Sequence, residues 1–136
     1  MADKELVQLL KQGVERWNQW RSSNAGRAID LSGADLRNAR LAGANLKKAN
    51  FQGAYLMGAD LRGAKVRGAD FRKADLTDAK LGELNLENTT FKFATLVRAN
   101  LQGADLTKVD MRGITGVYAD FRNTANQIDD PREVLG

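Results

Sequence analysis

Residues 29–53 read IDLSG ADLRN ARLAG ANLKK ANFQG, and this five-residue frame continues without insertion or deletion to residue 123. The third position of each pentad is a large apolar residue in every copy except the one that carries Gly116. The first position is mostly alanine, and the fifth position is glycine in eight of the 19 pentads. A repeat this regular predicts a solenoid in which each pentad is one structural unit.

The period of five fits neither a helix nor a flat strand. In an α-helix the third positions would advance about 140° around the axis per pentad, so they would form no apolar stripe. In a flat strand they would alternate between the two faces, because five is odd. A chain that bends once per pentad keeps every third position inside, and glycine gives the bends their backbone freedom. The sequence therefore predicts an all-β solenoid.

Several pentads follow the pattern A-[D/N]-L-x-x, among them ADLRN at 34–38, ANLKK at 44–48 and ADLTK at 104–108. They resemble the pentapeptide repeat family, which is abundant in cyanobacteria, and the resemblance extends over the whole unbroken frame, 29–123. The resemblance implies a right-handed quadrilateral β-helix with four pentads per coil, and about five coils in this chain. Residues 9–21 are also similar to N-terminal segments that precede such repeats.

The apolar residues are sorted in a way that fits four pentads per coil. If every fourth pentad stacks, all three phenylalanines of the middle repeats fall in one column: Leu31, Phe51, Phe71, Phe91 and Met111. The other three columns are almost entirely leucine. This sorting predicts a ladder of stacked aromatic rings inside the solenoid.

The ends of such a stack need covering, because their backbone groups would otherwise stay unpaired. Residues 3–21 have the apolar spacing of an amphipathic helix, which we expect to cover the first coil. The chain then divides into an N-terminal capping helix and linker at 1–28, the solenoid at 29–123 and a C-terminal cap or tail at 124–136. Asp130 and Pro131 are typical of the start of a short closing turn.

The composition offers little chemistry. The chain has no cysteine and no histidine, so the commonest metal ligands and the commonest general base are missing. Aspartate or asparagine precedes the inward residue in twelve pentads, and these side chains are typical of corner turns. We therefore predict no enzyme, no catalytic or metal-binding residue and no cofactor. The charged N-terminus and the lack of a long apolar segment predict a cytoplasmic protein without a membrane contact.

The net charge of +4 raises the question of nucleic acid. One basic patch is expected at Arg72, Lys73, Lys92 and Arg112. A second is expected at Lys47, Lys48, Lys65 and Arg67. Aspartates are interleaved with the first patch, which favours a solvated face over a nucleic-acid site. Some proteins of the resembled family mimic duplex DNA and bind topoisomerases, but 15 basic against 11 acidic residues in the repeats have the wrong sign for that role.

Six outward positions break the polar pattern: Tyr55, Met57, Phe93, Val97, Val117 and Tyr118. Two interpretations stay open, namely β-favouring residues scattered on a solenoid wall and a binding site for a partner. The sequence as a whole predicts a non-catalytic structural or protein-interaction scaffold. Its partner would be another protein or a second copy of the chain, and the sequence does not identify it.

Overall fold

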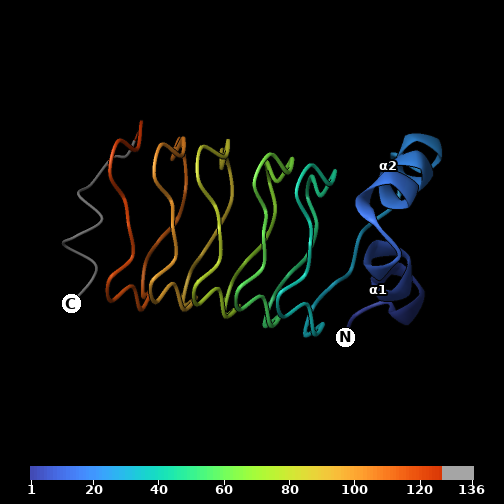
Figure 1. Ribbon diagram of the computed structural model, residues 1–136, viewed down its shortest axis with the longest axis horizontal. Helices are drawn as coiled ribbons and strands as arrows, with labels where there is room; N and C mark the ends of the chain where they lie inside the picture. Colours follow the sequence, from blue (N-terminus) through green and yellow to red (C-terminus); the bar gives the residue numbers. More distant parts are fainter. Residues whose placement is uncertain (127–136) are drawn as a thin grey trace.

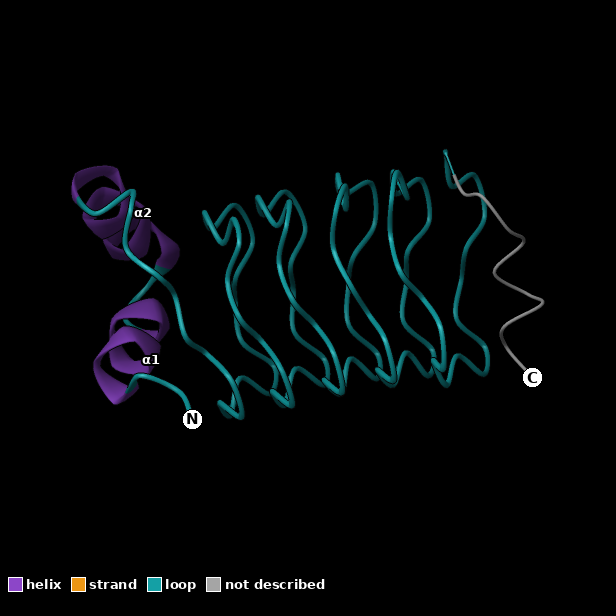
Figure 2. Cartoon of the chain, turned by 180° about the vertical axis from the view of Figure 1, so that it is seen from behind, coloured by secondary structure: helices purple, strands orange, loops and turns teal. Residues whose placement is uncertain are grey.

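The computed structural model describes residues 1–126, which form a solenoid of stacked coils with two helices at its N-terminal end (Figure 1). Parallel β-bridges join every fourth pentad, from Asp30 with Asn50 to Asp105 with Ala125. Four pentads therefore make one coil, as the sorting of the apolar residues predicts. Figure 2 shows the coils drawn as loops, because a bridge involves one residue per pentad and turns flank it on both sides. The expected all-β wall is thus a ladder of single bridges, without a regular strand among residues 1–126.

The coils are held together by backbone hydrogen bonds between them. Leu31 N–H donates to the Asn50 carbonyl at 2.8 Å, and Gly33 N–H donates to the Gln52 carbonyl at 2.9 Å. In return, Asn50 N–H donates to the Ile29 carbonyl at 2.8 Å. Only one bond per pentad, such as Ala34 N–H to the Leu31 carbonyl, stays within a coil. An isolated coil would therefore leave most of its backbone donors unpaired.

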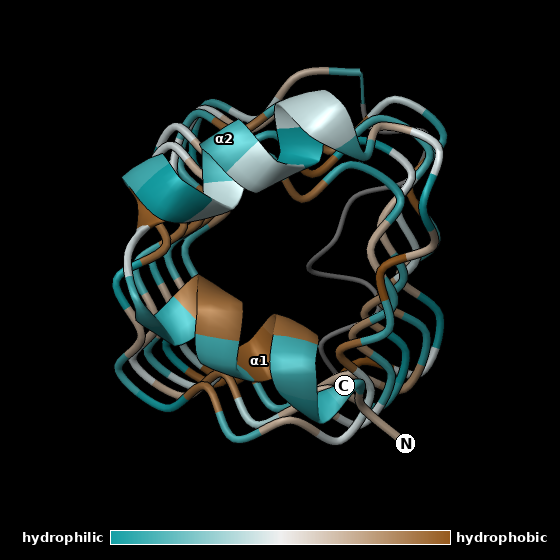
Figure 3. Ribbon diagram, turned by 90° about the vertical axis from the view of Figure 1, so that its right-hand side faces the viewer, coloured by the Kyte–Doolittle hydropathy of each residue, from teal (hydrophilic) through white to brown (hydrophobic). Residues whose placement is uncertain are grey.

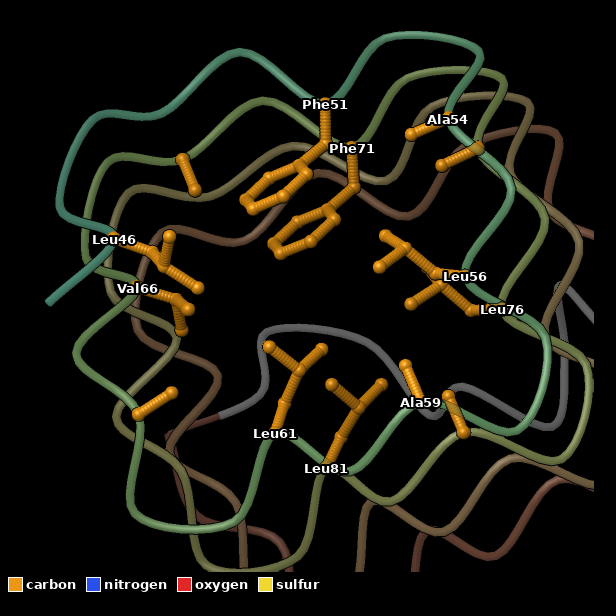
Figure 4. Close-up of a cluster of buried hydrophobic side chains, with 14 of the residues drawn as sticks. Leu46, Phe51, Ala54, Leu56, Ala59, Leu61, Val66, Phe71, Leu76 and Leu81 are labelled. Carbon is orange, nitrogen blue, oxygen red and sulfur yellow. The ribbon is translucent and has the colours of Figure 1, made fainter. Parts of the chain in front are cut away.

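The large third residues of the pentads point into the solenoid, and each stacks on its equivalent in the next coil, as Leu56 does on Leu76 (Figure 4). Phe51, Phe71 and Phe91 form the expected aromatic ladder, with ring centroids 5.0 Å and 4.9 Å apart and nearly parallel planes. We number the four sides by their inward residues: Leu31 begins side 1, Leu36 begins side 2, and sides 3 and 4 begin with Leu41 and Leu46.

The fifth residue of every pentad from Gly33 to Asn123 turns the corner with a positive φ, between 55° and 78°. Eight of these residues are glycine, which adopts this conformation freely. The other eleven carry a side chain, and two of them are the bulky aromatics Phe93 and Tyr118. The sequence pattern predicts glycine as the corner residue, but stacking imposes the same turn on every residue at this position.

Aspartates before the inward residue bind their own corner, as the turn-forming interpretation predicts. Asp60 Oδ1 accepts hydrogen bonds from Arg62 N–H at 3.0 Å and from Arg62 Nε at 2.9 Å. Arg62 Nη2 lies 2.7 Å from Asp60 Oδ2. The hydrogen bond from the Arg62 side chain lowers the pKa of Asp60 from its ordinary value of 3.8 to about 2.

The N-terminal segment forms two helices, α1 (Lys4–Lys11) and α2 (Val14–Ser23). The prediction of one helix over 3–21 is therefore wrong. Gly13 stands between them with φ 128°, a conformation that ends α1 and redirects the chain. Asp3 caps α1, because its side chain accepts hydrogen bonds from Glu5 N–H and Leu6 N–H.

Both helices lie across the end of the solenoid (Figure 3). Leu6, Leu10 and Trp17 are buried in the same hydrophobic core as the first coil. Among the described residues, neither α1 nor α2 is long and hydrophobic enough to cross a bilayer. The expected closing turn at Asp130 and Pro131 lies outside the described residues.

Replacing Leu76 by Asp tests the stacked interior. Leu76 is fully buried in the middle of the solenoid, so the carboxylate would have no partner and should destabilise the fold by about 4 kcal/mol or more. Thermal unfolding followed by circular dichroism should show loss of the cooperative transition. Lys80→Asp, at an exposed position of the same coil, is the control and should melt close to the wild type. A cooperative wild-type-like transition in Leu76→Asp would contradict its inward placement.

The corner carboxylates predict a loss of stability in acid. The pKa of Asp60 and that of Asp110 are both about 2 in the folded chain, well below the unfolded value of about 3.9. Their ionised forms therefore stabilise the fold above pH about 4, and this contribution is lost as the pH falls toward about 2. We expect the melting temperature to fall across that range.

The matched control is the double variant Asp60→Asn and Asp110→Asn, which keeps the corner acceptor but cannot titrate. Its melting temperature should fall less between the same two pH values. An acid-induced decrease identical to that of the wild type would show that these pairs do not contribute.

Candidate functional site

The six outward residues that break the polar pattern, which we call the apolar strip, lie on side 2 and at its corners. Val97 and Val117 are stacked on adjacent coils, because Asp78 N–H donates to the Val97 carbonyl and Arg98 N–H donates to the Val117 carbonyl, both at 2.9 Å. Tyr55 and Met57 lie two coils closer to the N-terminus on the same side. The structure therefore brings four members of the strip together near the C-terminal end, namely Phe93, Val97, Val117 and Tyr118. It places Tyr55 and Met57 apart from them.

The coil between these two groups is polar. Asp75 occupies the position between Tyr55 and Thr95, and its Oδ1 accepts hydrogen bonds from Thr77 N–H at 3.0 Å and from the Thr77 hydroxyl at 2.7 Å. Asp78 pairs with Arg98 across one coil step, at 2.8 Å. The apolar strip is consequently two apolar groups with a hydrogen-bonded polar step between them.

Phe93 and Tyr118 occupy the two corners that border side 2. Tyr118 is 84% exposed and Phe93 is 55% exposed, although both are large hydrophobic side chains. Both have positive φ, 62° for Phe93 and 61° for Tyr118, where a bulky residue is strained. Sequence reasoning found these residues as outward apolar positions but missed their backbone conformation. The available signal was their place at the fifth position of the pentad, where glycine is common.

The Phe93 side chain lies against the neighbouring corner. A Cβ added to Gly113 would lie 2.5 Å from Phe93 Cδ1, so the ring covers the Gly113 backbone. Lys92 Nζ lies 5.3 Å from the centroid of the same ring, within the range of a cation–π contact. The apolar strip thus adjoins the basic residues of side 1 at this corner.

The first basic patch is partly neutralised by its own aspartates. Arg72 Nη2 lies 2.7 Å from Asp70 Oδ2, and Arg112 Nη2 lies 2.7 Å from Asp110 Oδ2. The hydrogen bond from the Arg112 side chain lowers the pKa of Asp110 to about 2, so this carboxylate stays charged at neutral pH. Lys73 and Lys92 are neighbours on adjacent coils, since Lys73 N–H donates to the Lys92 carbonyl. The structure places all four basic residues on one side and pairs both arginines.

The second basic patch lies on side 4. Arg67 is paired there with Glu87, one coil further along, at 2.8 Å. Lys65 is bridged to Asn45, so Lys65 and Lys47 stand on adjacent coils. This side carries lysines close to the N-terminal helices and becomes mixed in charge toward the next coil.

The corner carboxylates bind within their own turns. Asp30 Oδ1 accepts the Ser32 hydroxyl at 2.6 Å, and Asp105 Oδ1 accepts the Thr107 hydroxyl at 2.7 Å. Within residues 1–126, no three acidic, cysteine or histidine side chains gather closely enough to hold a metal ion. The corner aspartates are thus engaged by hydroxyl groups of their own turns.

The repeats of this chain match a known protein family. The family model described as pentapeptide repeats matches eight copies, over residues 27–63, 54–92, 74–113 and 94–125. No curated protein sequence matches the chain significantly.

Several solved structures share the fold. A pentapeptide repeat protein from the cyanobacterium Cyanothece 51142 is 28% identical, with a TM-score of 0.65 over 73% of this chain and 65% of that protein. One from the thylakoid lumen of Arabidopsis thaliana is 29% identical, with a TM-score of 0.50 over 82% of this chain and 76% of that one. QnrB1, a plasmid-mediated fluoroquinolone resistance protein, is 20% identical with a TM-score of 0.50, over 82% of this chain and 64% of its own.

This chain spans 65% of the length of the Cyanothece protein. The family model covers most of the chain, and the parallel bridges between coils follow the same pentads. The chain belongs to the pentapeptide repeat family.

Proposed function

We propose that this chain is a non-catalytic scaffold that binds another protein through the apolar strip on side 2. The observation that carries the proposal is the pair Phe93 and Tyr118, two exposed aromatics in a strained corner conformation. A bulky residue in the left-handed region costs about 1–2 kcal/mol, and glycine would remove this cost. Tyr118, at 84% exposure, gains little from packing within the fold. The other corners have the same turn, so the feature that supports a binding role is an exposed aromatic side chain at a position where glycine would fit without strain.

The composition of the C-terminal part of the strip supports the same function. Between Phe93 and Val97, and again between Gly113 and Ala119, side 2 carries no charged residue. Val97 and Val117 lie on adjacent coils of side 2, between the corners that carry the two aromatics. Exposed aromatic residues beside a flat apolar surface are typical of protein interfaces, whose centres are depleted in charge. A two-fold self-association would use the same surface on both copies.

Other functions have less support. Proteins of this family generally act as structural or interaction scaffolds, which favours a non-catalytic role. The likeness to QnrB1 concerns the fold, since 20% identity carries no shared function. Mimicry of DNA requires a continuous negative surface, whereas Arg72 and Arg112 pair with aspartates along side 1. The same pairs leave fewer free cations for binding nucleic acid.

We also propose the finer architecture that the sequence predicts. Residues 1–28 would act as an N-terminal cap and residues 29–123 as a right-handed β-helix, as the family resemblance implies. The buried Trp17, whose Nε1 donates to the Asn45 carbonyl at 2.8 Å, supports a capping role for α2. A cytoplasmic location stays a prediction from the sequence.

Tyr118→Gly tests the strip without adding charge. The variant should be as stable as the wild type or more stable by up to about 1 kcal/mol, because glycine relieves the corner. It should nevertheless lose partners that the wild-type chain retains in affinity capture, or lose self-association in light scattering. Asn88→Gly, with φ 62° at a corner of side 4, is the matched control and should change neither.

Tyr55→Glu combined with Val97→Glu tests both groups of the strip with charges. Both side chains point outward, so the melting temperature should stay close to the wild type while association weakens. If the captured proteins and the oligomeric state are unchanged in both this variant and Tyr118→Gly, the strip is ordinary solenoid surface.

Deleting residues 1–24 tests the cap. Removal of both helices would expose Leu31 and the first coil's backbone edge, so the shortened chain should be less stable and should associate end to end. Analytical ultracentrifugation and thermal melting measure the two effects. A monomer with wild-type stability would show that the helices are not a cap.

A further inference from the structure

The backbone edge of the first coil is paired differently on its four sides. On side 4, α2 replaces the missing preceding coil with side chains. Asn45 N–H donates to Asn18 Oδ1 at 2.8 Å, and the Asn45 carbonyl accepts from Trp17 Nε1 at 2.8 Å. Arg21 Nη2 reaches the Lys47 carbonyl at 3.4 Å. On side 1, the Asp30 carbonyl accepts from Asp3 N–H at 2.9 Å.

Side 2 of the same edge has no such substitute among the described residues, and on side 3 only the Gly43 carbonyl is bonded, by Asn18 Nδ2 at 3.0 Å. Within residues 1–126, no donor or acceptor pairs with the backbone N–H and carbonyl of Asp35 or Arg40, or with the carbonyl of Arg37. All three residues are exposed. In the next coil the equivalent groups are bonded, since Tyr55 N–H donates to the Ala34 carbonyl at 2.9 Å and Asn38 N–H donates to the Met57 carbonyl at 2.8 Å. The first coil therefore presents unpaired backbone N–H and carbonyl groups that are spaced for a parallel β-bridge.

A groove runs beside this edge, between α1 and side 2. Its wider part has a volume of about 630 Å³, with Lys4, Val7 and Lys11 on the helix wall and Ala34 and Asp35 on the solenoid wall. A second hollow of about 450 Å³ continues it. The continuation is lined by Lys11 and residues 35–39. The two hollows share Lys11 and Asp35, so together they follow the free edge.

The groove has a defined chemistry. Val7 and Ala34 give it an apolar floor near the buried Leu36, which suits one apolar side chain. Lys4 and Lys11 place positive charge along it, and no ion pair joins either lysine to an acid among the described residues. An extended segment that carries acidic residues on either side of one apolar residue fits both features.

We propose that this groove binds an extended acidic peptide segment of another protein by strand addition to the first coil. In the register of the solenoid, two peptide N–H groups donate to the carbonyls of Asp35 and Arg37, and one peptide carbonyl accepts Asp35 N–H. The apolar residue of the peptide lies in the groove between Val7 and Ala34, because Leu36 is already buried. The site is at the end of the solenoid, one coil before Tyr55 and Met57, and lies apart from the C-terminal group of the apolar strip that contains Phe93 and Tyr118.

The probe is the synthetic peptide acetyl-(Ala-Asp-Leu-Glu-Gly)₂-amide, which has the required pattern. Titrated into the ¹⁵N-labelled full chain, it should shift the amide resonances of Asp35, Arg37 and Arg40 saturably. The same peptide with lysine in place of its acidic residues should bind at least about tenfold more weakly, a difference of about 1.4 kcal/mol. Absence of saturable binding, or shifts confined to other parts of the chain, would overturn the proposal.

Two pairs of variants separate backbone pairing from charge. Asp35→Pro removes the free N–H and should weaken binding at least about tenfold, whereas Asp35→Ala keeps it and should bind more tightly than the proline variant. Lys4→Glu with Lys11→Glu should also abolish binding of the acidic peptide. Lys65→Glu with Lys80→Glu makes the same change in net charge away from the groove and should bind like the wild type.

The remaining outcomes also decide between the alternatives. If Asp35→Pro does not fold, the comparison of the two lysine pairs is the test, and equal affinity in both pairs overturns the proposal. Equal affinity of folded Asp35→Pro and Asp35→Ala shows that the edge remains hydrated and is not used. A change in oligomeric state in Asp35→Pro, measured by light scattering without peptide, shows that the edge pairs with a second copy, and the peptide proposal is then wrong.

Discussion

The structure depends on the backbone hydrogen bonds that join each coil to the next. In most pentads the inward residue and the corner residue donate to the following coil, as Leu31 and Gly33 do. The few apolar side chains that one coil buries do not offset the conformational entropy lost when its residues are ordered. The coils are therefore stable as a stack, and the stack requires an unbroken register.

This constraint explains why the inside of the solenoid is uniform and the outside is not. An insertion of one residue would shift every later side chain out of its column, so the frame is kept over 19 pentads. The outward positions are not bound by this requirement. A solenoid wall with a constant backbone and variable surface residues is well suited to recognition. Here side 1 exposes basic side chains, whereas side 2 exposes the apolar strip. The corner residues link the two regions, because stacking forces Phe93 and Tyr118 into a strained turn that also exposes them.

A stacked fold also makes its ends chemically different from its sides. Interior coils pair their backbone on both faces, whereas the first coil has only one neighbouring coil. The helices α1 and α2 bury the apolar end through Leu6, Leu10 and Trp17. Their polar side chains reach only part of the edge, because two short helices present donors and acceptors at fewer points than a full coil does. Covering the hydrophobic core and pairing the backbone are thus separate tasks, and the helices complete the first more fully than the second.

The sequence alone determined the solenoid, because a strict period of five fits neither a helix nor a flat strand. The family resemblance implied four pentads per coil, and the sorting of phenylalanine to every fourth pentad fits this number and predicts the ladder. It also indicated the turn-forming aspartates and the outward apolar residues. It did not determine the break at Gly13, since a glycine within a periodic apolar pattern is compatible with a continuous helix. Nor did it determine the strained backbone of Phe93 and Tyr118 or the free edge at Asp35. These features arise only when coils and helices stack, because corner geometry and edge pairing depend on contacts between segments that are distant in the chain.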